Sequence, residues 1–187
     1  IDKDKLYQFL REMEFNRLLS SAISVYGEPN LESIKSDTKS YKKQKTIDKK
    51  EYHLITDIKQ LDKWIEEAEE FGEVAVDTET SSLDPHQADL VGISLSSEIG
   101  KACYVPIGHN SKKCIDKNLV LKKLKPLLED SSVKKIGQNI KFDFIIFYKN
   151  GINISSMEDT MLMSYVLDAG KNRHNMDTLS EIHLNHK

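Results

Sequence analysis

The sequence predicts an α/β fold in which a mixed sheet is flanked by helices. Three runs of β-type residues, 73–79, 89–97 and 101–107, follow one another closely with turn-forming residues between them. Strands that are so close in sequence favour antiparallel pairing. Helix-type and strand-type segments then alternate toward the end of the chain, which is typical of a sheet covered by helices.

The first fifty residues are predicted to form a helical segment and a linker. Residues 2–29 have apolar side chains at helical spacing, so they predict one amphipathic helix or two short ones that end at Gly27 and Pro29. Residues 30–50 are rich in lysine and contain almost nothing to bury. This composition predicts a solvated linker.

The ordered part is predicted to resume with a strand and a helix. Residues 51–55 carry a short strand pattern, and residues 57–71 form an amphipathic helix that Thr56 caps and Gly72 closes. Trp64 lies on the apolar face of this helix. We therefore expect Trp64 to be a core residue rather than a platform for stacking bases.

The rest of the chain is predicted to alternate between helix and strand. Residues 116–130 read as a helix, 133–138 as a short buried strand and 139–151 as a helix. Two further helices are predicted over residues 156–170 and 175–187.

Composition excludes some classes of protein. The chain has 187 residues, 30% charged and 39% hydrophobic, with a net charge of -3, so one sizeable core is expected and any contact with nucleic acid must be local. Its two cysteines, Cys103 and Cys114, are too few and too far from any histidine cluster for a zinc site, so a reducing compartment is expected. No apolar run approaches the length that a bilayer requires. We expect a soluble, cytoplasmic protein without membrane contact.

Two acidic residues, Asp77 and Glu79, end the first central strand. Residues two apart on a strand share one face, so the two carboxylates should lie side by side and repel each other. Their proximity is favourable if a divalent cation lies between them or if one acid is protonated. The alternative is a strand end whose acids point into solvent.

A second polar pair, Asn139 and Asp143, has helical spacing. Four residues apart on a predicted helix, the two side chains should share a face. Alone, such a pair is typical of a solvated helix face. Both polar pairs, however, are expected at strand ends beside helix starts, where sites gather in α/β sheets.

Three blocks of sequence together carry a family resemblance. VAVDTETSSLDP (74–85), KKIGQNIKFD (134–143) and DTMLMSYVLDAGKNRHNMDTLSE (159–181) resemble, in order and spacing, the 3′ to 5′ proofreading exonuclease domain of bacterial DNA polymerase I. The resemblance implies an RNase H-like, DnaQ-type exonuclease domain over residues 51–187. It also implies that residues 1–29 are the helical end of a preceding 5′ nuclease domain, with residues 30–50 as the tether.

The resemblance further implies a role for individual residues. Asp77 would bridge two metal ions, Mg²⁺ or Mn²⁺, while Glu79 would bind the first ion and Asp143 would steady the second. Leu83 would be an apolar wedge against the terminal bases, although ordinary loop packing is the alternative. Contacts to a single-stranded DNA 3′ end are expected from Thr78, Leu83, Asn139, Lys141 and Arg173.

The chain departs from the family at its last motif. The family supplies its final carboxylate from a Y-x-x-x-D motif on a later helix, and the YVLD segment at Tyr165 is one residue too short. We therefore expect a fragment with little activity of its own, part of a monomeric polymerase whose polymerase domain is its partner. The alternatives are a non-catalytic structural or DNA-binding module and an RNase D-like 3′ exoribonuclease.

Overall fold

The computed structural model describes residues 1–28, 51–109 and 113–186. The chain divides into two compact units, residues 1–42 and 43–187. The predicted linker over residues 30–50 lies outside the described residues. Within the described part of the chain, no helix is long and apolar enough to cross a membrane.

The first unit contains a pair of helices, as predicted. Helix α1 (Lys3–Glu12) and helix α2 (Asn16–Tyr26) contact each other. Asp2 caps α1 by accepting a hydrogen bond from the Lys5 amide. The buried Tyr7 donates its hydroxyl proton to the carbonyl of Gly27, which ties the end of α2 to α1.

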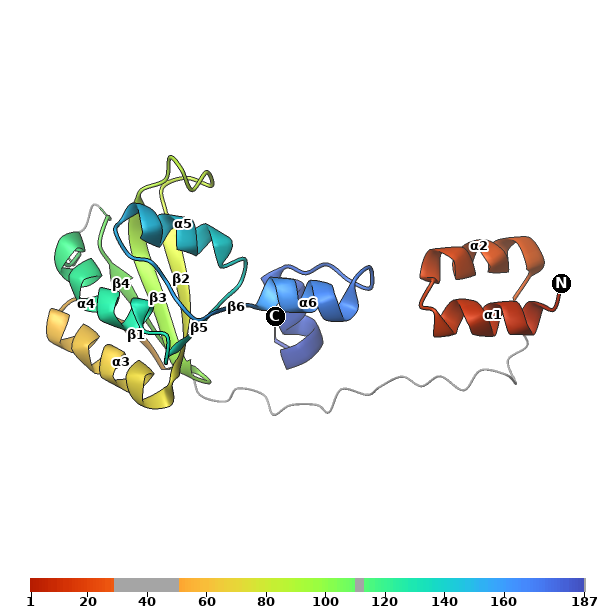
Figure 1. Cartoon of the computed structure of the whole chain (residues 1–187), viewed down its shortest axis with the longest axis horizontal. Helices are drawn as coiled ribbons and strands as arrows, with labels where there is room; N and C mark the ends of the chain where they lie inside the picture. The colour runs from red at the N-terminus through yellow and green to blue at the C-terminus, as the bar shows by residue number, and fades with distance from the viewer. Residues whose placement is uncertain (29–50, 110–112, 187) are drawn as a thin grey trace. The chain divides into compact units, whose positions relative to one another are not determined.

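The second unit is built on a six-stranded mixed sheet with the order β1-β4-β3-β2-β5-β6 (Figure 1). Strand β3 pairs antiparallel with β2 and β4, whereas the β1–β4, β2–β5 and β5–β6 pairs are parallel. The predicted mixed sheet and its antiparallel centre are thus confirmed. The strands are β1 (Glu51–Leu54), β2 (Glu73–Thr80), β3 (Leu90–Glu98), β4 (Lys101–Pro106), β5 (Lys134–Gly137) and β6 (Met157–Asp159).

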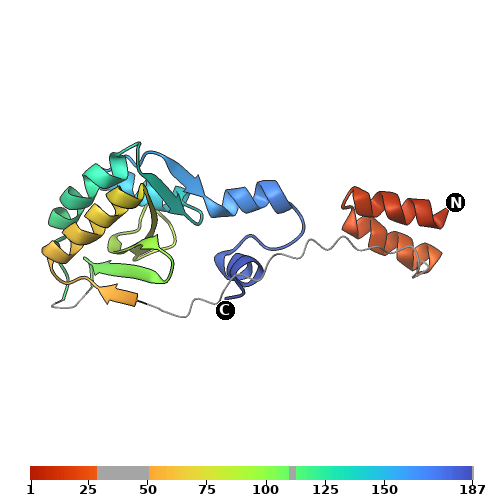
Figure 2. The same cartoon turned by 90° about the horizontal axis from the view of Figure 1, so that it is seen from below.

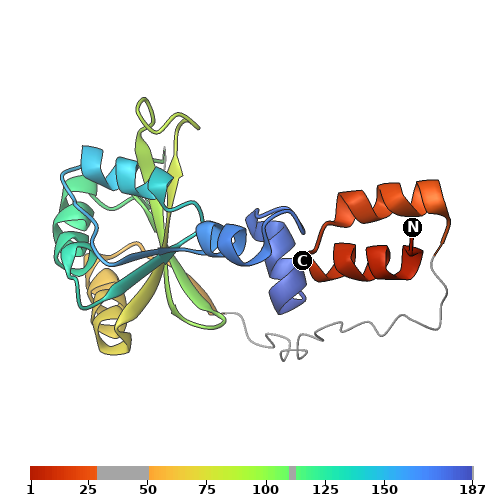
Figure 3. The same cartoon turned by 45° about the vertical axis from the view of Figure 1, so that its right-hand side comes forward.

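Helices cover the sheet mainly on one side. Figure 2 shows α3 and α4 side by side, and Figure 3 shows α5 on the same side of the sheet as these two helices. Val74 and Val76 of β2 are buried, whereas the residues that alternate with them are exposed. The helices are α3 (Ile58–Phe71), α4 (Lys117–Glu129), α5 (Lys141–Lys149), α6 (Thr160–Asp168), α7 (Met176–Leu179) and the π-helix η2 (Ser180–Leu184).

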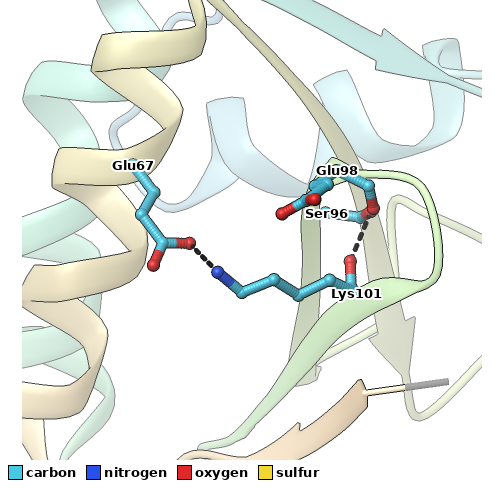
Figure 4. A network of polar contacts seen from close by, with 4 residues as sticks. All are labelled: Glu67, Ser96, Glu98 and Lys101. Atoms are coloured by element: carbon cyan, nitrogen blue, oxygen red, sulfur yellow. Dashed lines mark hydrogen bonds and ion pairs between the residues drawn. The ribbon is translucent and has the colours of Figure 1, made fainter. Parts of the chain in front are cut away.

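Polar contacts fasten α3 to the β3–β4 hairpin (Figure 4). The ammonium of Lys101 lies 2.6 Å from the carboxylate of Glu67 and 5.1 Å from the ring centroid of Trp64. Ser96 donates its hydroxyl proton to the carbonyl of Lys101 at 2.8 Å and lies 3.2 Å from that of Glu98. Trp64 is 7% exposed, which confirms it as a core residue.

The predicted cap of α3 is wrong by one residue. Asp57, not Thr56, is the N-cap, and its carboxylate accepts a hydrogen bond from the Lys59 amide at 3.0 Å. Asp57 has the extended backbone that an N-cap requires, with φ -134° and ψ 138°. The predicted end of the helix is confirmed, because Gly72 has a φ of +72°.

The prediction that Asn139 and Asp143 share a helix face is also wrong. Helix α5 begins at Lys141, and Asn139 precedes it with a φ of +60°. The cause lies elsewhere in the chain: the carboxylate of Asp159 accepts hydrogen bonds from the amides of Asn139 at 3.0 Å and Ile140 at 3.1 Å. These bonds hold the turn in a non-helical shape.

The predicted helix over residues 156–170 contains a strand that the pattern did not reveal. Strand β6 (Met157–Asp159) precedes α6 and pairs with β5. Three residues are too few to show a periodicity, and pairing across the sheet stabilises them as a strand.

Replacing the observed cap of α3 should destabilise the second unit. We expect Asp57→Ala to lower the free energy of unfolding by about 1 kcal/mol, because it removes an acceptor for an otherwise unpaired helix amide. Thr56→Ala is the matched control and should change it by less than about 0.5 kcal/mol. Urea unfolding followed by the fluorescence of Trp64, the single tryptophan, measures both. A larger loss for Thr56→Ala would contradict the assignment of the cap.

Candidate active site

A pocket of about 440 Å³ lies where β2 ends and α5 begins. Its wall combines the end of β2, the loop that follows it, the turn after β5 and the first turn of α5. Six residues that were predicted to contact substrate or metal therefore lie around one cavity. Four belong to β2 and the loop after it (Asp77, Thr78, Glu79 and Leu83), and two belong to α5 and the turn before it (Asn139 and Asp143). The lining residues are Asp77, Thr78, Glu79, Thr80, Ser81, Ser82, Leu83, Gln138, Asn139, Phe142 and Asp143.

Asp77 and Glu79 project from the same face of β2, as predicted. Exposed and buried positions alternate along the strand, with both acids at exposed positions and Thr78 buried between them. Partial burial raises the pKa of the Asp77 carboxyl, and the charge of Glu79 raises it further. The two acids thus concentrate negative charge at the pocket.

Asp143 approaches β2 from α5 and is 3% exposed. Its carboxylate accepts hydrogen bonds from the amide and the hydroxyl of Thr78, at 2.8 and 2.6 Å. Strand β5 pairs with β2 only as far as Ala75, so the Thr78 amide is available to Asp143. Burial raises the pKa of Asp143 to about 6, and the charge of Asp77 acts in the same direction. The hydrogen bonds from Thr78 oppose this shift.

Of the residues predicted to contact DNA, some line the pocket and others lie outside it. Asn139 lines the pocket, and the hydroxyl of Thr78 is already donated to Asp143. Lys141 and Arg173 are exposed and do not line the pocket. Leu83 lines it and is 96% exposed, so neighbouring residues do not bury its side chain.

Gln138 also lines the pocket and was not predicted as a site residue. Its amide oxygen accepts a hydrogen bond from the Thr160 hydroxyl at 2.6 Å, and its amide nitrogen donates to the carbonyl of His174 at 2.8 Å. The partners are 22 and 36 residues away. No local pattern could show these contacts, although Gln138 stands next to Asn139 in the GQN segment.

Tyr104 of β4 was also missed and lies close to the acids. Glu79 pairs with Gly92 of β3, and a Cβ on Gly92 would lie only 1.8 Å from the Tyr104 hydroxyl oxygen. The hydroxyl shares a hydrogen bond of 2.6 Å with Nε2 of His109. Burial raises the pKa of Tyr104, and the charge of Glu79 raises it further. Because Gly92 has no side chain, the Tyr104 ring can lie over it, next to Glu79.

The YVLD segment does not contribute to the pocket. The ring of Tyr165 lies 3.9 Å from the ring of His174, measured between centroids, and the carboxylate of Asp168 lies 3.2 Å from the ammonium of Lys171. Neither Tyr165 nor Asp168 lines the pocket. This agrees with the interpretation that the segment does not replace the family's last motif.

The pocket's side chains suit a hard divalent cation in kind. Asp77, Glu79 and Asp143 offer carboxylate oxygens, the ligands that Mg²⁺ and Mn²⁺ prefer. The charge of Glu79 disfavours the ionised form of Asp77, so a positive charge between the two carboxylates would offset their repulsion. Across the described ranges, no three His, Cys, Asp or Glu side chains form a ready-made group for a metal ion.

Solved structures of similar shape define the class of fold. NrnC from Brucella melitensis bound to pGG is 25% identical, with a TM-score of 0.58 over 74% of this chain and 62% of that one. RNase D from Escherichia coli is 19% identical, with a TM-score of 0.57 over 72% of this chain and 34% of that one, so it supports the fold alone. NrnC has also been solved with bound Mg²⁺. The second unit thus has the RNase H-like exonuclease fold.

Sequence comparison then gives the family. Residues 52–187 match the family described as 3'-5' exonuclease, and the chain belongs to this exonuclease family of A-type DNA polymerases. DNA polymerase I of Rhizobium leguminosarum is 43% identical over an alignment of 160 positions that covers 75% of this chain and 16% of that protein. DNA polymerase I of Pseudomonas aeruginosa is 35% identical over an alignment of 190 positions that covers 98% of this chain and 20% of that protein. The chain spans a fifth or less of the length of these relatives. The family match confirms the resemblance that the sequence blocks predicted.

The stability of the second unit should depend on pH through Asp143. Its pKa rises from 3.8 to about 6 on folding, so the folded chain binds this proton more tightly than the unfolded chain does. The free energy of unfolding should therefore fall as the pH rises from about 4 to about 6, and stay lower above that window. Asp143→Asn keeps an oxygen for Thr78 but carries no charge. In metal-free buffer we expect this variant to be more stable than the wild type by about 3 kcal/mol near pH 8.

Urea unfolding at a series of pH values measures this difference. The gain should disappear below about pH 4, where both side chains are neutral. Asp62→Asn removes a negative charge from the surface pair with Lys123 and serves as the control. A gain that is the same at low and high pH would show that the charge of Asp143 is not its cause.

Proposed function

We propose that the second unit is a proofreading-type 3′ to 5′ exonuclease domain that hydrolyses the 3′ ends of single-stranded DNA. The observation that carries the proposal is the gathering of Asp77, Glu79 and Asp143 around one pocket in a chain of this family. In this proposal the chain works inside a DNA polymerase I, as its relatives' names suggest.

The three carboxylates would hold divalent cations, Mg²⁺ or Mn²⁺. Asp77 and Glu79 offer adjacent oxygens on one strand face, and Asp143 offers the oxygen that Thr78 leaves free. When bound, a pair of such ions supplies an activated water and neutralises the departing 3′ oxygen. Thr78 acts as an orienting group, because its two hydrogen bonds fix the direction of the Asp143 carboxylate.

Substrate would be held by contacts that do not read base identity. Leu83 offers an apolar surface to the terminal base, while Asn139 offers a polar side chain at the pocket. Lys141 and Arg173 are exposed outside the pocket, where they would reach phosphates farther along the strand. Such contacts predict degradation that is largely independent of sequence.

The remaining assignments follow from the same proposal. Residues 1–29 would be the helical end of a 5′ nuclease domain, residues 30–50 a tether, and residues 51–187 the exonuclease domain. A polymerase domain of the same polypeptide would be the partner, in a monomeric protein of the cytoplasm. The alignment of 98% of the chain with the Pseudomonas polymerase I supports a common arrangement.

A non-catalytic, DNA-binding module is the second candidate. It is favoured by the observation that, in the described part of the chain, no three acidic, histidine or cysteine side chains are ready to hold a metal. In that case the acids would serve structure alone.

Trimming of 5′-labelled single-stranded DNA in Mg²⁺ or Mn²⁺ tests the proposal. The assay should use residues 1–187 and the longest polypeptide that the gene encodes, each with Asp77→Asn and the control Asp62→Asn. If the site is catalytic, Asp77→Asn should slow trimming from the 3′ end at least about 100-fold, because it removes a metal ligand, and Asp62→Asn should not. DNA binding without trimming in every form would favour the non-catalytic module. Preferred trimming of RNA would favour an RNase D-like enzyme.

Metal binding gives a second test that does not depend on turnover. We expect Mn²⁺, followed by its electron paramagnetic resonance signal, to bind residues 1–187 and to bind at least about tenfold more weakly to Asp77→Asn. The signal of free Mn²⁺ should be unchanged by Asp62→Asn. Equal binding by all three proteins would place the metal outside the pocket.

A further inference from the structure

The loop between β2 and β3 carries Leu83, an almost fully exposed residue that lines the pocket. Leu83 is 96% exposed, so neighbouring side chains do little to support it, and its position depends on the loop backbone. The loop's own hydrogen bonds are local: Ser81 and Asp89 close its base, and the carboxylate of Asp84 accepts from the amide of His86 at 2.9 Å. These bonds give the loop its shape but not its position against α5.

Lys149, in the last turn of α5, joins the helix to this loop. Its ammonium donates to the main-chain carbonyls of Pro85, His86 and Ala88 at 2.9, 2.8 and 2.9 Å. A lysine ammonium has three protons, and here each has a carbonyl acceptor. Hydrogen bonds from a charged donor are stronger than those between neutral groups. Figure 1 shows α5 running next to the loop at the top of the sheet.

The same helix also carries Asp143, one of the three acids of the pocket. Asp143 lies in the first turn of α5, six residues before Lys149, or about 9 Å along the axis. Ile146 and Phe147, between them, are fully buried. The helix is therefore packed firmly, and it fixes Asp143 against Thr78 at one end and the loop at the other.

We propose that Lys149 is a positioning residue that sets the β2–β3 loop, and Leu83 with it, at the mouth of the pocket. The inference rests on the proposed function, because Leu83 is taken as the contact for the terminal base. A lysine that bound a phosphate directly would need free ammonium protons, whereas all three of those of Lys149 have acceptors within the chain.

Hydrogen exchange tests the structural part of the proposal. In Lys149→Met the side chain keeps its apolar length and loses the ammonium, so the amides of residues 81–89 should exchange at least about tenfold faster. Lys149→Arg should restore part of the protection, because a guanidinium also donates to carbonyls. Lys125→Met is the matched control, since its ammonium bonds the carbonyl of Gly151 at 2.7 Å and lies 3.5 Å from the carboxylate of Glu129, without contacting the β2–β3 loop. Unchanged exchange in Lys149→Met would overturn the proposal.

A double-mutant cycle tests the functional part. The affinity of residues 1–187 for a labelled single-stranded oligonucleotide should fall about three- to tenfold in Leu83→Ala and in Lys149→Met. The double variant should be no weaker than Leu83→Ala alone, because Lys149 acts through Leu83. Full additivity would show that Lys149 contacts DNA itself and would overturn the proposal.

The two proposals can fail separately. If the wild-type chain does not bind the oligonucleotide, the proposed function fails for this chain. The exchange rates of the loop still decide whether Lys149 holds it. If the wild type binds and Lys149→Met binds equally well with a loosened loop, the proposed function stands and the positioning role is wrong.

Discussion

The hydrogen bonds from Thr78 to Asp143 are the contact on which the rest of the pocket depends. A carboxylate that is almost fully buried requires donors, and the backbone amide and hydroxyl of one residue supply both. They can do so because β5 stops pairing with β2 before Thr78. The same bonds hold the first turn of α5 at the end of β2. They therefore determine the position of Asp143 relative to Asp77 and Glu79.

The alternation of side chains along β2 separates the residue that anchors α5 from the two acids that face the pocket. Thr78 is buried while its two neighbours, Asp77 and Glu79, are exposed at the pocket. One tripeptide thus anchors the helix on one face of the sheet and presents two acids on the other. A shift of register by one residue would exchange these roles, so the antiparallel pairing of Asp77 with Ser94 and of Glu79 with Gly92 is part of the site.

Much of this arrangement could be predicted from local pattern. The strands of the central sheet, the amphipathic α3 and the common face of Asp77 and Glu79 all follow from periodicities of two and 3.6 residues. The failures occurred where distant residues decide the local structure. Asp159 makes Asn139 non-helical, and pairing with β5 makes residues 157–159 a strand. Gln138 was missed for the same reason, since its partners are remote in sequence.

The carboxylate of Asp159 has a consequence for cooperativity. It accepts hydrogen bonds from the amides of Met161 and Leu162, where it caps α6, and from those of Asn139 and Ile140 in the turn that lines the pocket. One buried side chain therefore caps the start of α6 and restrains the turn before α5. Fraying of α6 would remove the restraint on the turn, and a ligand that orders the turn would in return favour an intact α6. The pocket and α6 are thus thermodynamically linked through a single shared cap.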